Sequence, residues 1–580
     1  MRSVRRSLFL LGFLLLPTFT YAQTTLVGVV RDASGAVLPG VTVEASSSAL
    51  IEKTRSAISD GSGQYRITEL PPGNYAVAFM LPGFSKVVRD GLTLSGSGAI
   101  TVDVELRLGG LEETLTVTGE APVVDVQTTR RETVLSNDVL QSLPVTRSYT
   151  GIMSNIASLM PTGGVGAETN PGQINRFTAH GGRQNEGRIS VNGLLVTEPG
   201  SGAGVSSLAY DVSNVDEVQV LVSGGLGEAE TGGPIMNLVP RSGGNTFAGS
   251  AFYSGAGEWS RSNNVDDELR AIGILEPSAL INAFDVNGSL GGPILRDRLW
   301  FFGSARTFGQ TTAVSGAYAN LYAGDPTHWD YARNEGIVTR NASRYDIFSI
   351  RLTDQLTPRN RVSFSQENQY RCQGSTLTEN GEGCRARSED WIAVGNATNS
   401  PEAFPGYHDL PYYVTQATWS SPVSNRLLLD AGFSRFHYRF AGNGQVPPDG
   451  LTDLIPVTEQ STIYGLANFS YRGLYDPNAH AFADNKASSI QWRTSASYVT
   501  GAHNLKIGYM GSSLVQTSGR VANDSQLRYT FNNRNPVSFG YLLSPRWDTT
   551  DHTMTGALFV QDQWTLGKLT LQGAIRYDRA

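Results

Sequence analysis

The sequence predicts an exported, mainly β protein with several domains, and three observations support this class. The 580 residues include 64 Gly, 23 Tyr and 23 Phe but only 17% charged residues, a composition rich in strand and turn formers and poor in helix formers. Apolar and polar residues alternate in many runs after residue 245. A chain of this length also exceeds what one hydrophobic core accommodates, so we expect several domains.

The N-terminus has the three parts of a secretory signal peptide. Three arginines within the first six residues precede an apolar run over 8–16, and small residues follow up to Ala22. The apolar run is shorter than the roughly 20 residues that a membrane-spanning helix requires. We therefore expect residues 1–22 to be a signal peptide that is cleaved after Ala22.

Charge and cysteine content exclude several classes of function. The net charge of −7 argues against a nucleic-acid partner, because no basic stripe is present to displace phosphate counterions. Cys372 and Cys384 are the only cysteines, and in an exported chain such a pair predicts a disulfide across a loop. No histidine lies between them, which argues against a tetrahedral metal site. We expect no metal and no cofactor.

Residues 23–108 are expected to form one small β-sandwich. The stretch "TTLVGVVRDASGAVLPGVTVEA" alternates apolar and polar residues, and Gly and Pro separate the short β-rich runs that follow. "DGSGQY" and "LPPGNY" complete a pattern that resembles the carboxypeptidase regulatory-like domain. The resemblance implies a seven-stranded sandwich of the transthyretin or starch-binding type with no peptidase activity. We expect residues 60–63 to form a hairpin turn and not a calcium loop, since too few oxygen ligands follow.

Residues 109–120 are predicted to be a linker that contains a strand-prone segment. This segment resembles the TonB box, the extended motif through which TonB-dependent receptors add a strand to the sheet of their energising partner. The residues that carry the resemblance are Glu113, Thr114, Leu115, Thr116, Val117 and Thr118. A structural linker strand is the alternative.

Residues 121–245 are rich in glycine and are expected to form an α+β domain. "VDEVQV", a glycine-rich stretch and "NLVPRSGGNTFAG" resemble the plug domain of TonB-dependent outer-membrane receptors. The glycine spacings do not give the dinucleotide-binding pattern, so they indicate tight turns and close backbone approach. The plug-like motif residues are Ser190, Val191, Asn192, Gly193, Gly232, Gly233, Asn237, Ser242 and Gly243.

Residues 246–580 are predicted to be part of an antiparallel transmembrane β-barrel. Runs of about eight to ten residues alternate, with an apolar face such as Leu505, Ile507 and Tyr509 opposite a polar face that includes Lys506. Short turns alternate with long connections, as in outer-membrane barrels with brief periplasmic turns and large extracellular loops. The predicted turns are 293–298, 357–360, 421–425, 500–503 and 565–568, and the predicted long connections are 309–344, 371–410, 439–487 and 517–552.

The stretch "LGGPILRDRLWFFGSARTF", residues 290–308, places three aromatic residues directly after a predicted turn. We expect residues 291–298 to form that turn and Trp300, Phe301 and Phe302 to lie in an aromatic girdle at the membrane interface. A hydrophobic core cluster is the alternative. This stretch and "LFVQDQWTLGKLTLQGAIRYD" resemble barrel hairpins of the TonB-dependent receptors.

About eleven barrel strands are expected, whereas the resemblance implies closure near 22 strands around a plug. An open edge in hydrocarbon leaves backbone polar groups unpaired at several kcal/mol each. We therefore expect a C-terminally incomplete receptor, represented by about half its strands.

The resemblance implies a TonB-dependent receptor in the cell outer membrane and no enzyme. Its expected partners are the TonB energising complex in the periplasm, outer-membrane lipid and a scarce extracellular ligand, such as a glycan, an iron chelate, a peptide or a vitamin. No H-E-x-x-H or G-x-S-x-G motif indicates catalysis. Two alternatives remain open: a surface protein for adhesion or protein export, and a secreted carbohydrate-binding protein.

Overall fold

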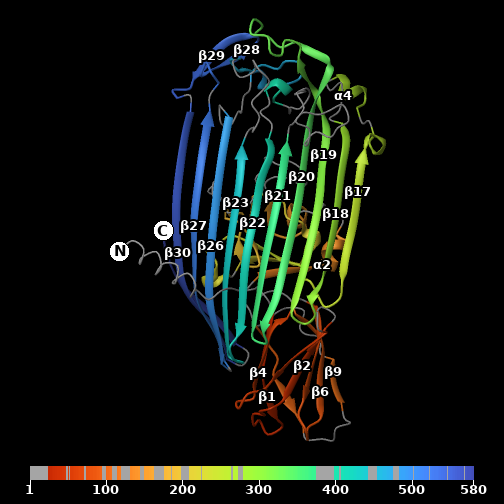
Figure 1. Cartoon of the computed structure of the whole chain (residues 1–580), viewed down its shortest axis with the longest axis vertical. Helices are drawn as coiled ribbons and strands as arrows, with labels where there is room; N and C mark the ends of the chain where they lie inside the picture. The colour runs from red at the N-terminus through yellow and green to blue at the C-terminus, as the bar shows by residue number, and fades with distance from the viewer. Residues whose placement is uncertain are drawn as a thin grey trace.

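The structure is a computed structural model. It describes residues 24–47, 50, 53–70, 73–94, 99–107, 114–118, 131–143, 149–161, 176–183, 186–196, 208–223, 225–262, 265–271, 279–373, 398–403, 407–441, 454–473, 482–500, 502–521, 523–544, 546–566 and 569–580. The predicted signal peptide lies outside these residues. The protein has four parts: a β-sandwich at one end of the long axis, a tall curved sheet in the middle, an inner domain that this sheet surrounds, and a small sheet at the far end (Figure 1).

The sandwich consists of two sheets that enclose one hydrophobic core. The first contains β4 (Gln64–Leu70), β1 (Thr24–Asp32), β7 (Ala99–Thr101) and β8 (Val104–Leu106). The second has the order β3 (Thr54–Ile58), β2 (Thr42–Ser46), β5 (Gly73–Met80), β6 (Lys86–Leu94) and β9 (Thr114–Thr118). Val43, Tyr65, Val77 and Phe79 are almost fully buried between the sheets. In the described residues the sandwich has nine strands, two more than the expected seven, and β9 lies beyond the predicted end of the sandwich at residue 108.

The inner domain, which we call the plug, comprises the described residues of 131–245. Its sheet has the order β10 (Arg131–Ser136), β15 (Val215–Ser223), β16 (Ile235–Pro240), β13 (Arg188–Val191) and β14 (Leu194–Leu195). Around it lie α2 (Asn137–Ser142), α3 (Tyr149–Met153), η3 (Val212–Asn214), η4 (Leu226–Glu228) and the hairpin of β11 (Leu159–Pro161) and β12 (Phe177–Ala179). This mixture of helices and a sheet agrees with the expected α+β class.

The tall sheet, which we call the wall, has eleven strands, as the sequence predicts. Every neighbouring pair is antiparallel. In order, the strands are β17 (Ala248–Gly257), β18 (Leu280–Leu295), β19 (Leu299–Asn320), β20 (Arg333–Thr357), β21 (Asn360–Gln373), β22 (Tyr407–Pro422), β23 (Leu427–Ala441), β26 (Phe482–Thr500), β27 (His503–Val521), β30 (Arg546–Leu566) and β31 (Leu569–Arg579).

Short and long connections alternate along the wall, which confirms the predicted asymmetry. The tight turns follow β18, β20, β22, β26 and β30, and they lie at the end of the wall near the sandwich (Figure 1). Most of the strands are longer than the expected eight to ten residues, and β20 has 25, whereas β17 has 10. The long connections are correspondingly shorter, because polar, strand-forming residues continue the pairing beyond the apolar band.

The two faces of the wall differ in the way that the alternation predicts. Leu505, Ile507 and Tyr509 on β27 are 38%, 55% and 38% exposed on the outer face. Lys506, between them, points inward and binds Glu228 of the plug at 2.7 Å. The outer face is therefore apolar and open, and the inner face holds the plug.

The aromatic triplet on β19 lies differently from the expectation. Trp300 and Phe302 are 6% and 8% exposed and face inward, and the indole N–H of Trp300 donates to Asn245 Oδ1 at 2.8 Å. Phe301 has the outward orientation, where its ring lies 6.3 Å from that of Phe247. The girdle prediction is wrong for Trp300 and Phe302, because consecutive strand residues point to opposite faces. The predicted turn is also too long, since only residues 296–298 leave the strands.

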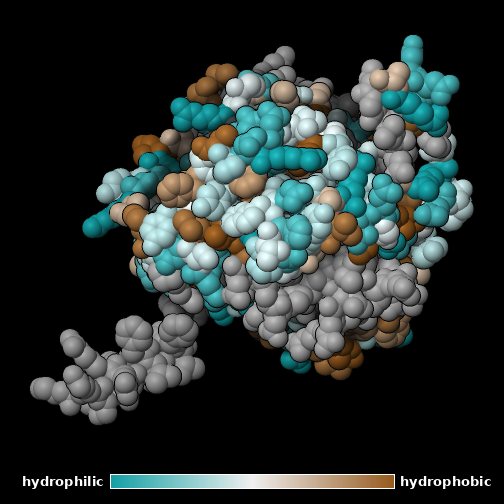
Figure 2. Space-filling view, turned by 90° about the horizontal axis from the view of Figure 1, so that it is seen from above, coloured by the Kyte–Doolittle hydropathy of each residue, from teal (hydrophilic) through white to brown (hydrophobic). Residues whose placement is uncertain are grey.

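Four long connections fold together into one unit at the end opposite the sandwich, which we call the cap. Its sheet has the order β25 (Phe469–Arg472), β24 (Val457–Glu459), β28 (Leu527–Asn532) and β29 (Asn535–Tyr541). The end of β19 and η6 (Pro401–Ala403) pack against it, and Tyr331, Phe469 and Tyr471 form its core. Seen from this end, polar side chains predominate over scattered apolar ones (Figure 2).

The connection between β17 and β18 contains η5 (Glu258–Ser260) and α4 (Asp267–Ala271). Of the helices in the described residues, none combines the length and the apolar character needed to cross a membrane.

Candidate functional site

The predicted plug motif comes together around one side chain, Asn237 of β16. Its Oδ1 accepts hydrogen bonds from Ser190 Oγ at 3.0 Å and from the Gly193 N–H at 2.7 Å. Its Nδ2 donates to Gln219 Oε1 at 2.9 Å. Asn237 therefore fixes the turn between β13 and β14 on the plug sheet.

Side chains of the wall also hold that turn. Asn192 Nδ2 donates to Gln416 of β22 at 3.1 Å, and Arg351 of β20 donates to Asn192 Oδ1 at 3.3 Å. Arg493 of β26 donates to the carbonyl oxygens of Gly193 at 2.9 Å and Asn192 at 3.3 Å. Three wall strands thus bind two consecutive plug residues.

The other motif residues lie apart from this turn. Gly233 follows η4 and packs against the backbone of Glu186, and Gly243 packs against the backbone of Phe301 of the wall. Gly232 has open space around it, and Ser242 is half-buried beside Gly243. Gly233 therefore makes a close contact within the plug, and Gly243 makes one between the plug and the wall.

A buried ion-pair network joins the plug to a second place on the wall. Arg306 of β19 binds Asp285 of β18 at 2.9 Å and Asp211 of the plug at 3.4 Å. The side chains of Arg306 and Asp211 are 6% and 5% exposed. Asn287 of β18 donates to Asp211 at 2.6 Å. Buried charges require such partners, since desolvation makes them costly alone.

η4 is the third anchor of the plug. Glu228 binds Lys506 of β27 at 2.7 Å and accepts a hydrogen bond from Gln561 of β30 at 2.9 Å. Arg576 of β31 donates to the Gly227 carbonyl at 3.0 Å. The last three wall strands thus bind η4 through three polar side chains, two at the Glu228 carboxylate and one at the Gly227 carbonyl.

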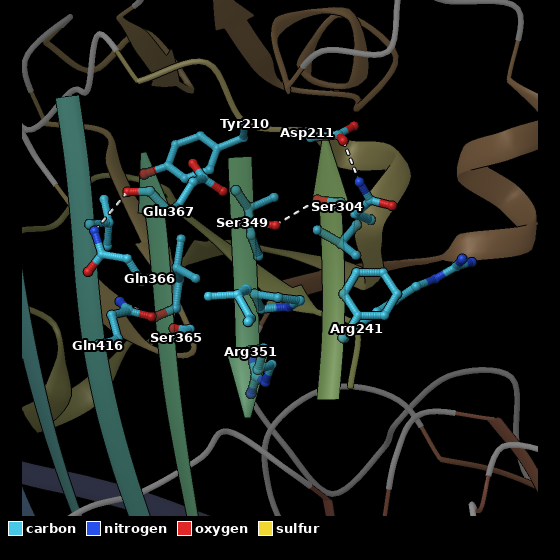
Figure 3. Close-up of a pocket in the computed structure, with 18 of the residues that line it drawn as sticks. Tyr210, Asp211, Arg241, Ser304, Ser349, Arg351, Ser365, Gln366, Glu367 and Gln416 are labelled. Atoms are coloured by element: carbon cyan, nitrogen blue, oxygen red, sulfur yellow. Dashed lines mark hydrogen bonds between the residues drawn. The ribbon is translucent and has the colours of Figure 1, made fainter. Parts of the chain in front are cut away.

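Between these anchors lies a cavity of about 70 Å³, lined by both the plug and the wall (Figure 3). Tyr210, Asp211 and Arg241 reach it from the plug, and Arg351 and Glu367 reach it from β20 and β21. Apolar side chains such as Phe302 and Val414 line it together with these polar groups, and its volume is sufficient for a few water molecules. The interface between plug and wall thus combines polar anchors with apolar packing, in which Tyr412, Val414 and Phe436 of the wall join the hydrophobic core of the plug.

The TonB-box-like segment forms β9, which pairs in parallel with β6 from Lys86↔Thr114 to Asp90↔Thr118. It is the edge strand of the second sandwich sheet in the described part of the chain. Glu113 lies outside the described residues. The predicted linker is thus ordered at this point, in the extended conformation that strand addition requires.

The predicted disulfide remains a prediction. Cys372 lies near the end of β21, and Cys384 lies outside the described residues. Within the described residues, no cluster of three or more His, Cys, Asp or Glu is placed to hold a metal ion.

Gly193 gives a direct test of the plug turn. Its φ is +68°, and a Cβ atom there would lie 2.6 Å from Nη1 of Arg493. We expect Gly193→Ala to weaken plug docking by about 1–2 kcal/mol or more, because a side chain in this backbone region is strained. The thermal unfolding midpoint of the protein in detergent measures this. Gly232→Ala is the matched control, since it meets nothing within 4 Å, and an equal loss in both variants would contradict the expectation.

The fold and the anchored plug define a class, and comparisons with known proteins agree. The carboxypeptidase regulatory-like domain family matches residues 25–107. The TonB-dependent transporter Oar of Myxococcus xanthus is 30% identical over 301 residues, which cover 50% of this chain and 27% of the relative. The chain therefore has the architecture of the TonB-dependent outer-membrane receptors, with an N-terminal carboxypeptidase regulatory-like domain.

A solved structure supports the same fold. The outer-membrane transporter YddB from Escherichia coli superposes with a TM-score of 0.50 at 11% identity, covering 77% of this chain and 56% of that one. The siderophore receptor PirA from Acinetobacter baumannii gives a TM-score of 0.45 at 13% identity, covering 77% and 56%. The chain thus spans about a quarter of the curated relative and little more than half of each solved chain.

Proposed function

We propose that the protein is an outer-membrane receptor that takes up an extracellular ligand, with TonB as its energising partner. The observation that carries the proposal is a plug held inside a curved sheet whose outer face is apolar. Polar anchors fix the plug beside apolar packing, in which Tyr412, Val414 and Phe436 of the wall extend the hydrophobic core of the plug. Moving the plug within the wall therefore requires both kinds of contact to break, which is work that an energising partner can supply.

The apolar outer face supports a place in the outer membrane. Ile507, Ile575 and Leu558 are 55%, 73% and 57% exposed on neighbouring strands of the wall. Burying such a face in lipid removes apolar surface from water. The edge strands of the described wall are β17 and β31. We propose that further strands complete the barrel, because an open edge in hydrocarbon is costly.

The cap supports ligand capture at the extracellular end, and its chemistry is aromatic and cationic. The guanidinium of Arg472 lies 4.1 Å from the ring centre of Trp329, and that of Arg333 lies 4.2 Å from the ring centre of Tyr464. Arg472 is 5% exposed and donates to backbone carbonyl oxygens of the cap, whereas Trp329 and Tyr464 are 36% and 46% exposed, so these two rings are the parts that a ligand can contact. Aromatic surface of this kind suits many ligand classes, and the cargo is proposed only as a small extracellular ligand such as a glycan, an iron chelate, a peptide or a vitamin.

We propose β9 as the strand that TonB recognises. Strand addition depends on main-chain N–H groups, so Leu115→Pro with Val117→Pro removes two donors from this strand. We expect binding of the purified C-terminal domain of TonB to fall at least tenfold, or about 1.4 kcal/mol, in a titration with the detergent-solubilised protein.

Leu115→Ile with Val117→Ile is the matched control, because it keeps every backbone donor, and it should bind as the unchanged protein does. If the proline variant binds TonB as tightly as the isoleucine variant, β9 is not the recognition strand. Fractionation of cells tests the location separately: the proposal requires the protein in the outer membrane, and recovery from the medium without detergent would favour a secreted binding protein.

A further inference from the structure

A group of cations lies on the outer face of the wall, on the neighbouring strands β22, β23 and β26. The inward side chains of these strands join the hydrophobic core of the plug, and they are Tyr412, Val414, Phe436, Tyr438 and Ala487. Consecutive strand residues point to opposite faces, so the residues that alternate with these five point outward. The outward residues form what we call the cation cluster: Tyr413, Arg435, His437, Arg439 and Lys486.

The members of the cation cluster are neighbours across the three strands. Tyr413 and His437 are register partners, and their stacked rings have centroids 4.8 Å apart. The guanidinium of Arg435 lies 5.4 Å from the centre of the Tyr413 ring. Arg439 is the register partner of Lys486 on β26. Three permanent cations and one histidine therefore share a small area of the outer face.

The cation cluster lies where the apolar part of the outer face ends. β23 runs from the tight turn beside the sandwich toward the cap (Figure 1), and its outward residues before Arg435 include Leu427, Leu429 and Phe433. From Leu427 to Arg435 the strand rises roughly 26 Å, which compares with an apolar band of about 25 Å in outer-membrane barrels. With the cap outside the cell, the cation cluster therefore lies at the level of the headgroups of the outer leaflet.

Cations at the end of an apolar band can also serve only to reach water, but two observations favour a bound anion. In the described part of the chain, Arg435 is exposed and forms no ion pair with a carboxylate. Nδ1 of His437, on the same face, has no hydrogen-bond partner there. Arg344 differs, because it lies on the outer face of β20 and pairs with Asp346 at 3.0 Å. The cation cluster thus offers positive charge that this part of the wall does not neutralise at Arg435.

We propose that the cation cluster binds the phosphate group of a phosphorylated lipid in the outer leaflet. Guanidinium and ammonium groups form charge-assisted hydrogen bonds to phosphate oxygens, and a guanidinium can donate two of them in parallel. The acyl chains of the same lipid lie along the apolar residues on the sandwich side of the cluster, beginning with the register partners Phe433 and Trp492. A dissolved anion lacks this second contact, so a lipid is the occupant that fits both surfaces.

This site rests on the proposed place of the protein in the outer membrane and goes beyond ligand uptake. The cation cluster lies on the face of the wall opposite the plug, so lipid binding there needs neither TonB nor a cargo. A bound lipid joins β22, β23 and β26 on the outside, where the plug joins them on the inside.

Native mass spectrometry of the full protein in detergent tests the site, with dioctanoyl phosphatidic acid as the titrated probe. We expect Arg435→Gln with Arg439→Gln to weaken binding of the probe about tenfold or more, because two cations leave the phosphate. Arg296→Gln with Arg298→Gln is the matched control, since it removes the same two charges from exposed positions at the sandwich end of the wall. It should bind the probe as the unchanged protein does.

Arg435→Lys with Arg439→Lys guards against a general loss of the fold, since it keeps both charges and should bind the probe within about threefold of the unchanged protein. The proposal is overturned if the glutamine variant binds the probe as tightly as the control does. It is also overturned if dioctanoylglycerol, which lacks the phosphate, binds equally well, or if inorganic phosphate at the same concentration displaces the probe. Because TonB takes no part in this measurement, a failure of β9 to bind TonB contradicts the proposed function and leaves this result standing.

Discussion

Arg306→Ala should release the side of the plug that faces β18 and β19. The substitution removes the shared cation of Asp211 and Asp285 and leaves two carboxylates facing each other in a largely buried site. Breaking a buried pair by removing one partner costs about 3–5 kcal/mol. We therefore expect exchange of the plug amides at 208–215 to rise steeply, and the thermal midpoint in detergent to fall.

Arg344→Ala is the control for this prediction. Arg344 lies on the neighbouring strand β20 and pairs with Asp346 of the same strand at 3.0 Å. Its loss should lower stability slightly and leave plug exchange unchanged. Equal plug exchange in the two variants would show that the Asp211 contact does not hold the plug.

The cap should lose stability as the pH rises through neutrality. Burial raises the pKa of the Glu402 carboxyl to about 7, although Ser400 Oγ and the Asn320 N–H donate to it. The folded cap therefore favours the protonated acid. The contribution of Glu402 to the stability of the cap is complete below pH 4.5, the usual pKa of this carboxyl, and it is lost as the pH rises through about 7. A difference of 2.5 pH units corresponds to about 3 kcal/mol.

Proteolysis of the cap at pH 6 and pH 8 measures this effect, and Glu402→Gln should remove the difference. Glu459 provides the opposite case. Burial raises the pKa of its carboxyl, but hydrogen bonds from Ser461 and from the backbone of Arg534 and Asn533 outweigh burial and hold the pKa below its usual value. Its contribution is present above 4.5 and is lost in acid, so Glu459→Gln should destabilise the cap at pH 6 and pH 8 alike. If Glu402→Gln keeps the pH difference, another group titrates.

The wall was predictable because its signals are local. Period-two alternation places Leu505 and Ile507 on one face and Lys506 on the other, and each tight turn interrupts that alternation at a definite residue. The same alternation indicates that Arg493 and Arg576 point inward. The plug motif was also readable, and Ser190, Gly193 and Asn237 do meet.

The partners of these inward charges were not predictable. Arg493 and Asn192 are 301 residues apart, and no local pattern states which plug atom a wall side chain will meet. The position of Trp300 was also not predictable from local sequence. Its aromatic character fits both a lipid interface and a core, and the choice depends on the register of β19 against the plug, which is set by the assembled fold.

The cap places a constraint on how such a protein can acquire a new ligand. β24 pairs in parallel with β28, joining Val457 to Tyr529, although the two strands come from different connections of the wall. A transplanted surface loop would arrive without the strand that completes its hydrogen bonds. Recombination between relatives should therefore give a folded cap only when both connections come from the same parent. Among natural relatives, the sequences of these two connections should vary together.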